Sequence, residues 1–146
     1  MQDGLHRGRA AIVTGGASGI GRAAATLLAE QGARVCVADL DREGASRVAK
    51  EIEERGGTAF AHGVDVSEPE ANEGMVREAL ARFGAVDVAF LNAGIAQGST
   101  IHGGDVAVFD RVLAVNLRGV FLGLRAVAQP MVAARRGAIV CTASVA

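Results

Sequence analysis

A glycine-rich segment near the start of the chain limits its possible folds more than any other feature. Residues 14–21 read Thr-Gly-Gly-Ala-Ser-Gly-Ile-Gly; the apolar run 10–13 before them predicts a buried strand, and residues 19–31 predict a helix. Glycines at such a turn allow a tight bend and a close approach of the backbone to a phosphate. The unpaired N–H groups of the first helical turn then face the anion. The segment therefore predicts a cradle for the pyrophosphate of a dinucleotide.

A nucleoside-triphosphate loop is the nearest alternative for this segment. Gly16 and Gly21 have the glycine spacing of such a loop, but Arg22 and Ala23 stand where it needs Lys and Ser or Thr. Without that hydroxyl there is no magnesium ligand, so the sequence argues against a Walker-type NTPase.

Short apolar runs alternate with longer amphipathic stretches along the whole chain. We expect strands at 10–13, 34–38, 58–64, 86–91 and 137–142, and helices at 19–31, 41–55, 67–84 and about 106–136. In the first helix, Ile20, Ala24, Leu27 and Leu28 are expected to share one face. This alternation predicts an α/β fold, with βαβ units and a parallel sheet that helices cover on both faces. Residues 1–146 are expected to form one domain.

Asp39 stands at the end of the second expected strand, beside the glycine turn. A carboxylate there can accept hydrogen bonds from both adenosine ribose hydroxyls, and it would repel a 2′-phosphate. The turn holds no Lys or Arg, and the nearest basic residue after the strand is Arg42. These features favour NAD over NADP. The alternative is a solvated acid, or part of a helix cap with Asp41.

Composition argues against several other classes of function. The 15 basic residues nearly balance the 16 acidic ones, no basic run exceeds 135–136, and the aromatic residues are five Phe, so nucleic acid is not an expected partner. No apolar run approaches the roughly 20 residues needed to cross a bilayer, and the polar N-terminus has no signal-peptide core. We expect a cytoplasmic protein without membrane contact.

Cysteines and histidines give no sign of a metal site. Cys36 and Cys141 each lie in an apolar strand-like run and are expected to be buried and inert. His6, His62 and His102 are far apart and share no ligand spacing, so no metal site is expected.

Polar or small residues follow three further strands, and an asparagine lies within the last helix. These are Asp65-Val66, Asn92-Ala93-Gly94 and Ser144 after the strands, and Asn116 in the helix. Together with the glycine turn, they resemble the short-chain dehydrogenase/reductase family over nearly the whole chain. The resemblance implies a Rossmann-type doubly wound parallel sheet of five strands in the order 3-2-1-4-5, truncated before the family's later strands. It also implies an NAD(P)-dependent oxidoreductase acting on a small alcohol or carbonyl compound.

The resemblance further implies roles for individual residues. Asn116 would interrupt helix bonding and hold a water in a proton relay, and Ser144 would hydrogen-bond the reacting hydroxyl or carbonyl. Asp65 and Val66 would contact adenine through the carboxylate and a backbone group, and residues 92–94 would line the nucleotide. The expected cofactor-binding set is Gly15, Ser18, Gly19, Ile20, Gly21, Asp39, Leu40, Asp65, Val66, Asn92, Ala93, Gly94 and Val115.

One part of the family pattern is missing from these residues. The family's acid/base is a tyrosine in a Tyr-x-x-x-Lys pair beyond the fifth strand, but the sequence has no tyrosine and its one lysine, Lys50, lies in the second helix. We therefore expect residues 1–146 alone to catalyse no turnover. Because the fifth strand would then be an open edge, we also expect low stability or self-association. The family resemblance points to homo-oligomers.

Two other functions remain open at this point. The chain could be a stand-alone module that binds a nucleotide or a partner and catalyses nothing. An S-adenosylmethionine methyltransferase also uses a glycine turn and an acid after the second strand. That class does not explain Asn92-Ala93-Gly94, Asn116 and Ser144 together.

Overall fold

The computed structural model describes residues 4–98 and 100–144. Its strands are β1 (Ala10–Thr14), β2 (Arg34–Asp39), β3 (Thr58–Gly63), β4 (Val88–Leu91) and β5 (Ala138–Cys141). Its helices are α1 (Gly19–Glu30), α2 (Arg42–Glu54), α3 (Pro69–Phe83), α4 (Val106–Leu113) and α5 (Gly119–Ala134). A short 3-10 turn, η1 (Ile101–Gly103), precedes α4, and a π-helical turn, η2 (Ala114–Arg118), joins α4 to α5. Every expected strand and helix is present, with small differences in its bounds.

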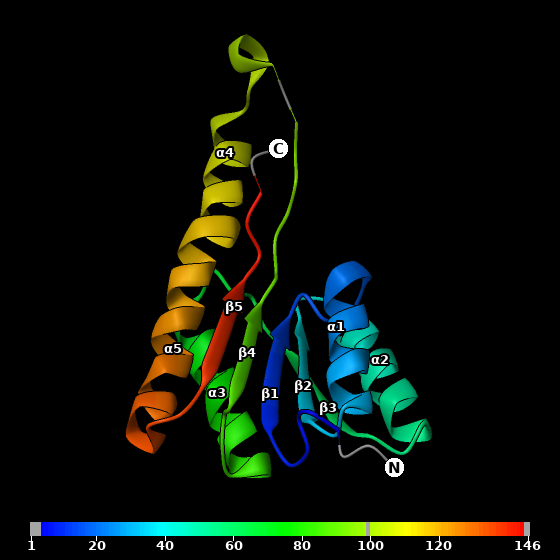
Figure 1. Ribbon diagram of the computed structural model, residues 1–146. Helices are drawn as coiled ribbons and strands as arrows, with labels where there is room; N and C mark the ends of the chain where they lie inside the picture. Colours follow the sequence, from blue (N-terminus) through cyan, green and yellow to red (C-terminus); the bar gives the residue numbers. More distant parts are fainter. Residues whose placement is uncertain (1–3, 99, 145–146) are drawn as a thin grey trace.

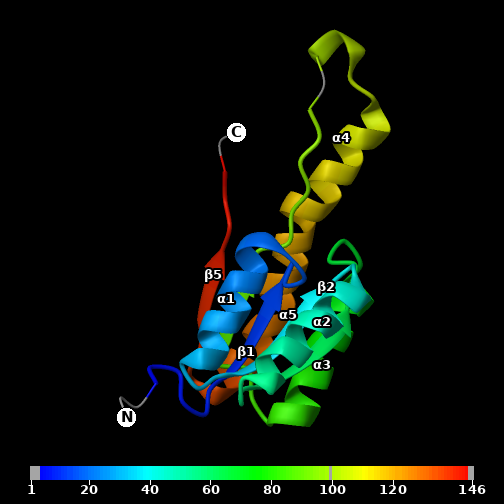
Figure 2. The same cartoon turned by 90° about the vertical axis from the view of Figure 1, so that its right-hand side faces the viewer.

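The five strands form one parallel sheet in the order β3-β2-β1-β4-β5, which confirms the predicted topology (Figure 1). β1 is central, and its Ile12 is in register with Cys36 of β2 and Ala89 of β4. All strands run in the same direction, so their carboxyl ends share one edge of the sheet. The loop after β4 and the helix α4 extend beyond this edge, as Figures 1 and 2 show.

Side chains of the strands alternate between two hydrophobic cores, one on each face of the sheet. Ala11 and Val13 pack in the core beneath α1 and α2. Ile12 and Cys36 point the other way, into the core beneath α3 and α5. This two-sided burial explains why the strands read as continuous apolar runs.

The inner face of α1 differs from the prediction. Its buried residues are Gly21, Ala25 and Ala29, whereas Ile20 and Leu27 are 68% and 57% exposed. Of the predicted residues, Leu28 is partly buried and packs against the core. The fully buried residues of α1 are small because the glycine turn brings this helix close to the strands.

The two cysteines lie in different environments. Cys36 is buried as predicted, and its burial raises the pKa of the thiol well above its ordinary range. Cys141 is exposed, and its predicted burial is therefore wrong. It belongs to β5, which has only β4 as a neighbour among the described strands and all of whose residues are exposed.

The expected helix at 106–136 runs on through three parts, α4, η2 and α5. Asp105 caps its start, because the Asp105 side chain accepts a hydrogen bond from the Ala107 N–H at 2.9 Å. Within residues 4–98 and 100–144, no helix has the length and apolar character that a membrane crossing needs.

Candidate functional site

Apart from Val115 and Asn116, which lie in η2, the predicted site residues follow the carboxyl ends of the strands, which lie along one edge of the sheet (Figure 1). Open α/β sheets bind ligands at this edge, where the strand order reverses beside the first strand. In this sheet the reversal lies between β1 and β4, since β2 lies on one side of β1 and β4 on the other.

The glycine turn between β1 and α1 is built so that side chains cannot cover its backbone. Gly15 has a φ of 66°, a conformation that residues with a side chain rarely adopt. A Cβ at Gly15 would lie 3.0 Å from the Ala93 Cα, and a Cβ at Gly21 would overlap the Gly15 carbonyl oxygen. Ser18 is the N-cap residue of α1 and makes no side-chain cap bond, while Ile20 in the first turn is largely exposed. The N–H groups at the start of α1 are thus accessible to an anion.

Asp39 connects this turn to the loop after β2. One of its carboxylate oxygens accepts a hydrogen bond from the Ala17 N–H at 3.0 Å, and the other accepts one from the Asp41 N–H at 2.9 Å. The Asp41 side chain caps α2 by accepting from the Gly44 N–H at 2.9 Å. Asp39 is therefore not the cap itself. Each of its oxygens has a further lone pair that could accept a bond from a hydroxyl group.

The segment 92–94 joins the ends of three strands. The N–H groups of Asn92 and Ala93 both donate to the Thr14 hydroxyl of β1, at 3.0 and 3.1 Å. The Asn92 side-chain oxygen accepts from the Thr142 hydroxyl, just after β5, at 2.9 Å. The two threonines were not among the predicted site residues. A threonine at the end of each strand was the available signal, but the connection between them depends on the sheet order.

Asn116 lies in η2 and is bound to the loop after β4. Its side-chain oxygen accepts from the Ile95 N–H and its amide donates to the Ile95 carbonyl, both at 2.8 Å. The turn around Asn116 is π-helical, so regular α-helical bonding is interrupted there. The side chain of Val115, the preceding residue, is buried in the core, so only its backbone could reach a ligand.

The loop after β3 carries Asp65, Val66 and Ser67. One Asp65 oxygen accepts from the Ser67 hydroxyl at 2.6 Å and from the Ser67 N–H at 3.0 Å. Ser67 therefore belongs to this loop, and the N-cap of α3 is Glu68. The hydrogen bond from the Ser67 hydroxyl is the main reason that the pKa of Asp65 lies below its ordinary value of 3.8.

Two arginines of the long helix contact the same loop, and neither was predicted as a site residue from the sequence. Arg111 of α4 approaches the second Asp65 oxygen, with its two terminal nitrogens at 3.4 and 3.5 Å. Arg118 of η2 donates to the Ser67 carbonyl at 2.7 Å. No motif separates these arginines from the others in the chain, because the contact depends on how the helix lies across the loop.

Two other predicted positions lie at the same edge. Leu40, just after β2, is 66% exposed. Ser144 follows β5 and is exposed.

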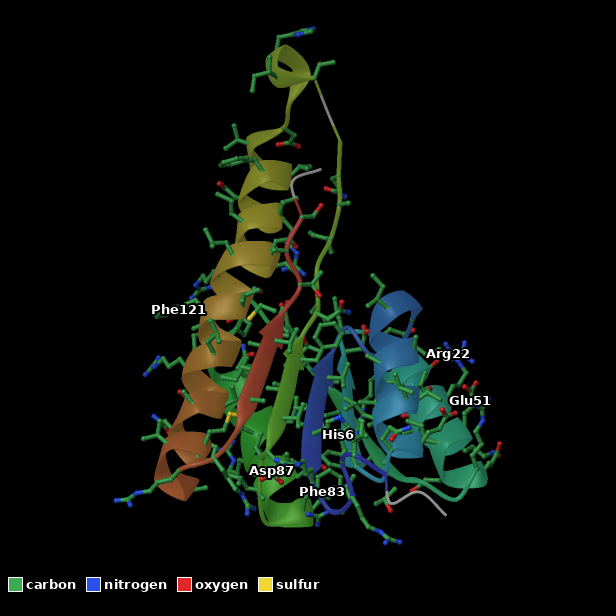
Figure 3. The ribbon with its side chains drawn as sticks, viewed as in Figure 1. His6, Arg22, Glu51, Phe83, Asp87 and Phe121 are labelled. Atoms are coloured by element: carbon green, nitrogen blue, oxygen red, sulfur yellow. The ribbon has the colours of Figure 1, made fainter. Side chains whose placement is uncertain are left out.

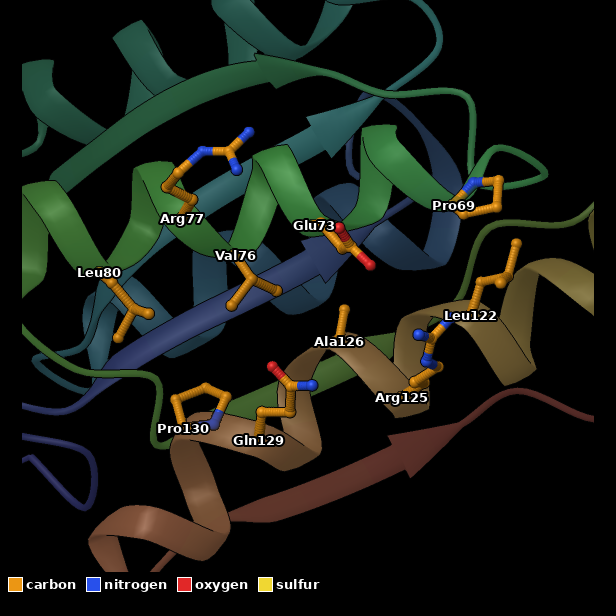
Figure 4. Close-up of a pocket in the computed structure, with 10 residues that line it drawn as sticks. All are labelled: Pro69, Glu73, Val76, Arg77, Leu80, Leu122, Arg125, Ala126, Gln129 and Pro130. Carbon is orange, nitrogen blue, oxygen red and sulfur yellow. The ribbon is translucent and has the colours of Figure 1, made fainter.

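A separate groove lies on the outer face, between α3 and α5 (Figure 4). It contains none of the predicted site residues. Its lining residues are Pro69, Glu73, Val76, Arg77, Leu80, Leu122, Arg125, Ala126, Gln129 and Pro130.

Comparison with known proteins identifies relatives over almost all of the chain. The family described as short chain dehydrogenase matches residues 9–146. Momilactone A synthase of Oryza sativa subsp. japonica is 44% identical over 140 residues, and cyclohexanol dehydrogenase of Acinetobacter sp. (strain SE19) is 40% identical over 139 residues. Each match covers 94% of this chain but only 50% and 55% of the relative, so the chain spans about half the length of the curated relatives it matches.

A solved structure has the same fold. The crystal structure of a short-chain type dehydrogenase/reductase from Mycobacterium marinum matches with a TM-score of 0.92 at 36% sequence identity. The match covers 95% of this chain and 57% of that chain.

Proposed function

The chain belongs to the short-chain dehydrogenase family, and from this premise we propose that it binds NAD at the carboxyl ends of its strands. We propose that the bound NAD serves hydride transfer to or from a small alcohol or carbonyl compound. In this proposal, residues 1–146 form a single dinucleotide-binding domain. When bound, the dinucleotide supplies the nicotinamide ring that takes up or gives up the hydride.

The observation that carries the proposal is the open backbone of the glycine turn. A side chain at Gly21 would collide with the Gly15 carbonyl, and one at Gly15 would collide with Ala93. The first residue of α1, Gly19, has no atom within 4 Å of where a side chain would stand, so the N–H groups that begin α1 are open to a pyrophosphate at the favourable end of the helix dipole.

The preference for NAD over NADP rests on Asp39. Its carboxylate is held by the Ala17 and Asp41 N–H groups and keeps lone pairs for the ribose hydroxyls. The negative charge would repel a 2′-phosphate at this position. Arg42 is the nearest arginine after β2. Its side chain packs against Gly63 at the end of β3, where an added Cβ would lie 3.3 Å from the Arg42 carbons.

The remaining roles follow the same edge. Asp65 and the backbone of Val66 bind adenine, and Asn92 steadies the nucleotide wall through Thr14 and Thr142. Asn116 and Ser144 belong to the catalytic end of the site. Full dehydrogenase activity needs a proton-transferring phenol, and no tyrosine occurs within residues 1–146. For these residues alone we therefore propose cofactor binding without turnover.

A titration of the 146-residue chain with NAD and with NADP tests the cofactor proposal. We expect tighter binding of NAD than of NADP. We expect Asp39→Ala to reduce the ratio of the two affinities about tenfold, because a hydrogen bond to a charged group contributes roughly 1.5–3 kcal/mol. Asp39→Asn keeps the shape of the side chain and should retain part of the NAD affinity without the repulsion. The exposed Asp110→Asn serves as the control. An unchanged preference in Asp39→Ala would refute the role of this carboxylate.

The second candidate is a binding module without catalysis. It is favoured by the lack of tyrosine and by the position of Lys50, which is exposed on α2 and paired with Glu54. For residues 1–146 both candidates predict no turnover, so an assay for NADH formation with a range of secondary alcohols tests that shared expectation. The encoding DNA downstream of codon 146 distinguishes the two candidates, because a Tyr-x-x-x-Lys motif there supports the dehydrogenase and its absence supports the binding module. Enzyme-dependent NADH formation by residues 1–146 would overturn the proposal that this part catalyses no turnover.

A further inference from the structure

The loop after β3 presents an acceptor and a donor beside each other. One Asp65 oxygen is fully engaged by Ser67, so the other oxygen is the one left for a ligand. Among the described residues, the Val66 N–H donates to no partner. Adenine offers the complementary pair along one edge, with an amino group that donates and a ring nitrogen that accepts. A 6-oxopurine carries an acceptor oxygen in place of that amino group.

The protonation state of Asp65 makes this distinction sharper. With an ordinary pKa of 3.8, lowered further here by the Ser67 hydroxyl, the side chain is ionised at neutral pH, and an ionised carboxylate can only accept hydrogen bonds. A 6-oxopurine would therefore place its oxygen against a carboxylate oxygen, and the two acceptors would repel each other.

Arg111 is the cation beside the ligand-facing oxygen. Its two terminal nitrogens lie 3.4 and 3.5 Å from that oxygen, longer than the 2.7–2.9 Å of a fully formed charged hydrogen bond. At this distance the guanidinium attracts the carboxylate and limits its rotation while leaving a lone pair available. Arg118 holds the neighbouring Ser67 carbonyl, and the Val66 side chain rests against Gly119, so the whole loop lies on the long helix.

We propose that Arg111 is a positioning residue that sets the selectivity of this site for adenine over 6-oxopurines, and that it acts through Asp65. The inference rests on the proposed function, since it requires the dinucleotide to bind at this edge. It assigns α4 a part in cofactor recognition, although α4 itself projects beyond the sheet (Figure 2).

The test compares the affinities of NAD and its deamino analogue, in which hypoxanthine replaces adenine. For the wild-type chain we expect a preference for NAD of roughly tenfold, as for a good pair of base contacts. Arg111→Met should reduce this preference about threefold to fivefold, the range of a half-exposed ion pair. Arg111→Lys, which keeps the positive charge, should retain part of the preference for NAD. Arg125→Met, an exposed arginine of α5 in the outer groove, should leave it unchanged.

A double-mutant cycle separates positioning from general damage to the fold. In an Asp65→Asn background, Arg111→Met should change the preference little, because the group through which it acts has lost its charge. A purely structural role of Arg111 would weaken both ligands equally and leave their ratio unchanged, which would overturn the inference. The inference is also overturned if Arg111→Met changes the ratio of the two affinities as much in the Asp65→Asn background as in the wild-type chain. If the wild-type chain binds neither dinucleotide, the proposed function itself fails; if it binds both with a preference that Arg111→Met preserves, only the role of Arg111 fails.

Discussion

At the scale of single residues, Gly21 is where the fold and the candidate site meet most closely. It is buried on α1, and a Cβ there would overlap the Gly15 carbonyl oxygen, a backbone atom that cannot move aside cheaply. We expect Gly21→Ala to destabilise the fold by about 1–3 kcal/mol, as overpacking does, and to weaken dinucleotide binding. Thermal unfolding and a binding titration measure the two effects.

Gly74 provides the matched control for this prediction. It lies within α3, where the nearest atom to an added Cβ is an Arg77 side-chain nitrogen at 3.6 Å. Gly74→Ala should stabilise the chain by roughly 0.5–1 kcal/mol, because alanine loses less conformational entropy in a helix. If Gly21→Ala and Gly74→Ala change the stability equally, the close contact between Gly21 and the Gly15 carbonyl does not restrict residue 21 to glycine.

Residues also show where the sequence was sufficient. The glycines could be placed from their position between a strand and a helix, because that requirement is local. The bonds of Asn92 to Thr14 and Thr142 could not, because they join residues that only the sheet order brings together. The exposure of Cys141 could not be read from its apolar run either, since it depends on what lies beside β5.

At the scale of elements, Asp87 joins the starts of two strands to the segment after α5. It lies just before β4 near the end of the sheet opposite the candidate site, and is 3% exposed (Figure 3). One of its oxygens accepts from the Ala10 N–H of β1 at 2.9 Å, and the other pairs with Arg136 at 2.8 Å. No role was predicted for Asp87 from the sequence, because an acid at the start of a strand gives no sign of its partners.

Substitution of Asp87 and substitution of its ion-pair partner Arg136 should differ in their effect on stability. Asp87→Ala leaves the buried Ala10 N–H without its acceptor, which costs about 1–3 kcal/mol. Arg136 is 62% exposed but the Asp87 side chain is only 5% exposed, so Arg136→Ala should cost more than the loss of a surface ion pair. It should still cost less than Asp87→Ala, because the carboxylate keeps the Ala10 N–H as a partner. Denaturant unfolding of both variants checks this order. A larger effect of Arg136→Ala would mean that the ion pair, and not the backbone contact, holds the strands.

The contact of α3 with the edge strand β3 should depend on pH. Desolvation raises the pKa of Glu78, but its hydrogen bonds with His62 and Arg82 outweigh this and hold the pKa below its ordinary value of 4.5. A lowered pKa in the folded state means that the carboxylate stabilises the fold above its unfolded pKa, and that this contribution is lost as the pH falls through the folded value. Glu78→Gln should therefore lower the melting temperature at pH 7 more than at pH 3.

Glu73 supplies the control for this pH dependence. It lies on the same helix, is exposed, and makes no hydrogen bond or ion pair within the described ranges. Glu73→Gln should leave the melting temperature nearly unchanged at both pH values, since its carboxylate has no partner to lose. If Glu78→Gln behaves like Glu73→Gln, the bonds to His62 and Arg82 do not contribute to stability.

At the scale of the whole molecule, apolar side chains are buried in the two cores but exposed along β5 and the long helix. The two cores under α1 and α2 and under α3 and α5 are closed, whereas every residue of β5 is exposed. On the long helix, Phe109, Leu113, Leu117 and Phe121 are exposed at intervals of four residues, and Figure 3 shows Phe121 on the outer side of α5. The open edge of the fifth strand led us to expect low stability or self-association, and these exposed apolar residues lie where such association could occur.

We therefore predict that the 146-residue chain associates through the free edge of β5. An edge strand with unpaired N–H and C=O groups and apolar side chains is a template for pairing with another chain. Val140 is 56% exposed in the middle of this strand, and Val140→Lys should shift the chain towards monomer, because a charged side chain on an edge opposes such pairing. Sedimentation velocity over a wide range of concentration measures the effect.

Val132→Lys separates the edge from apolar exposure in general. Val132 is 75% exposed on α5, so the substitution adds the same charge at an exposed valine outside the sheet. Equal shifts towards monomer in the two variants would indicate that association follows overall charge or the helix surface. A wild-type chain that is monomeric at every concentration and unfolds in one sharp, reversible transition would contradict the prediction entirely, because the fold would then tolerate β5 as an uncovered edge.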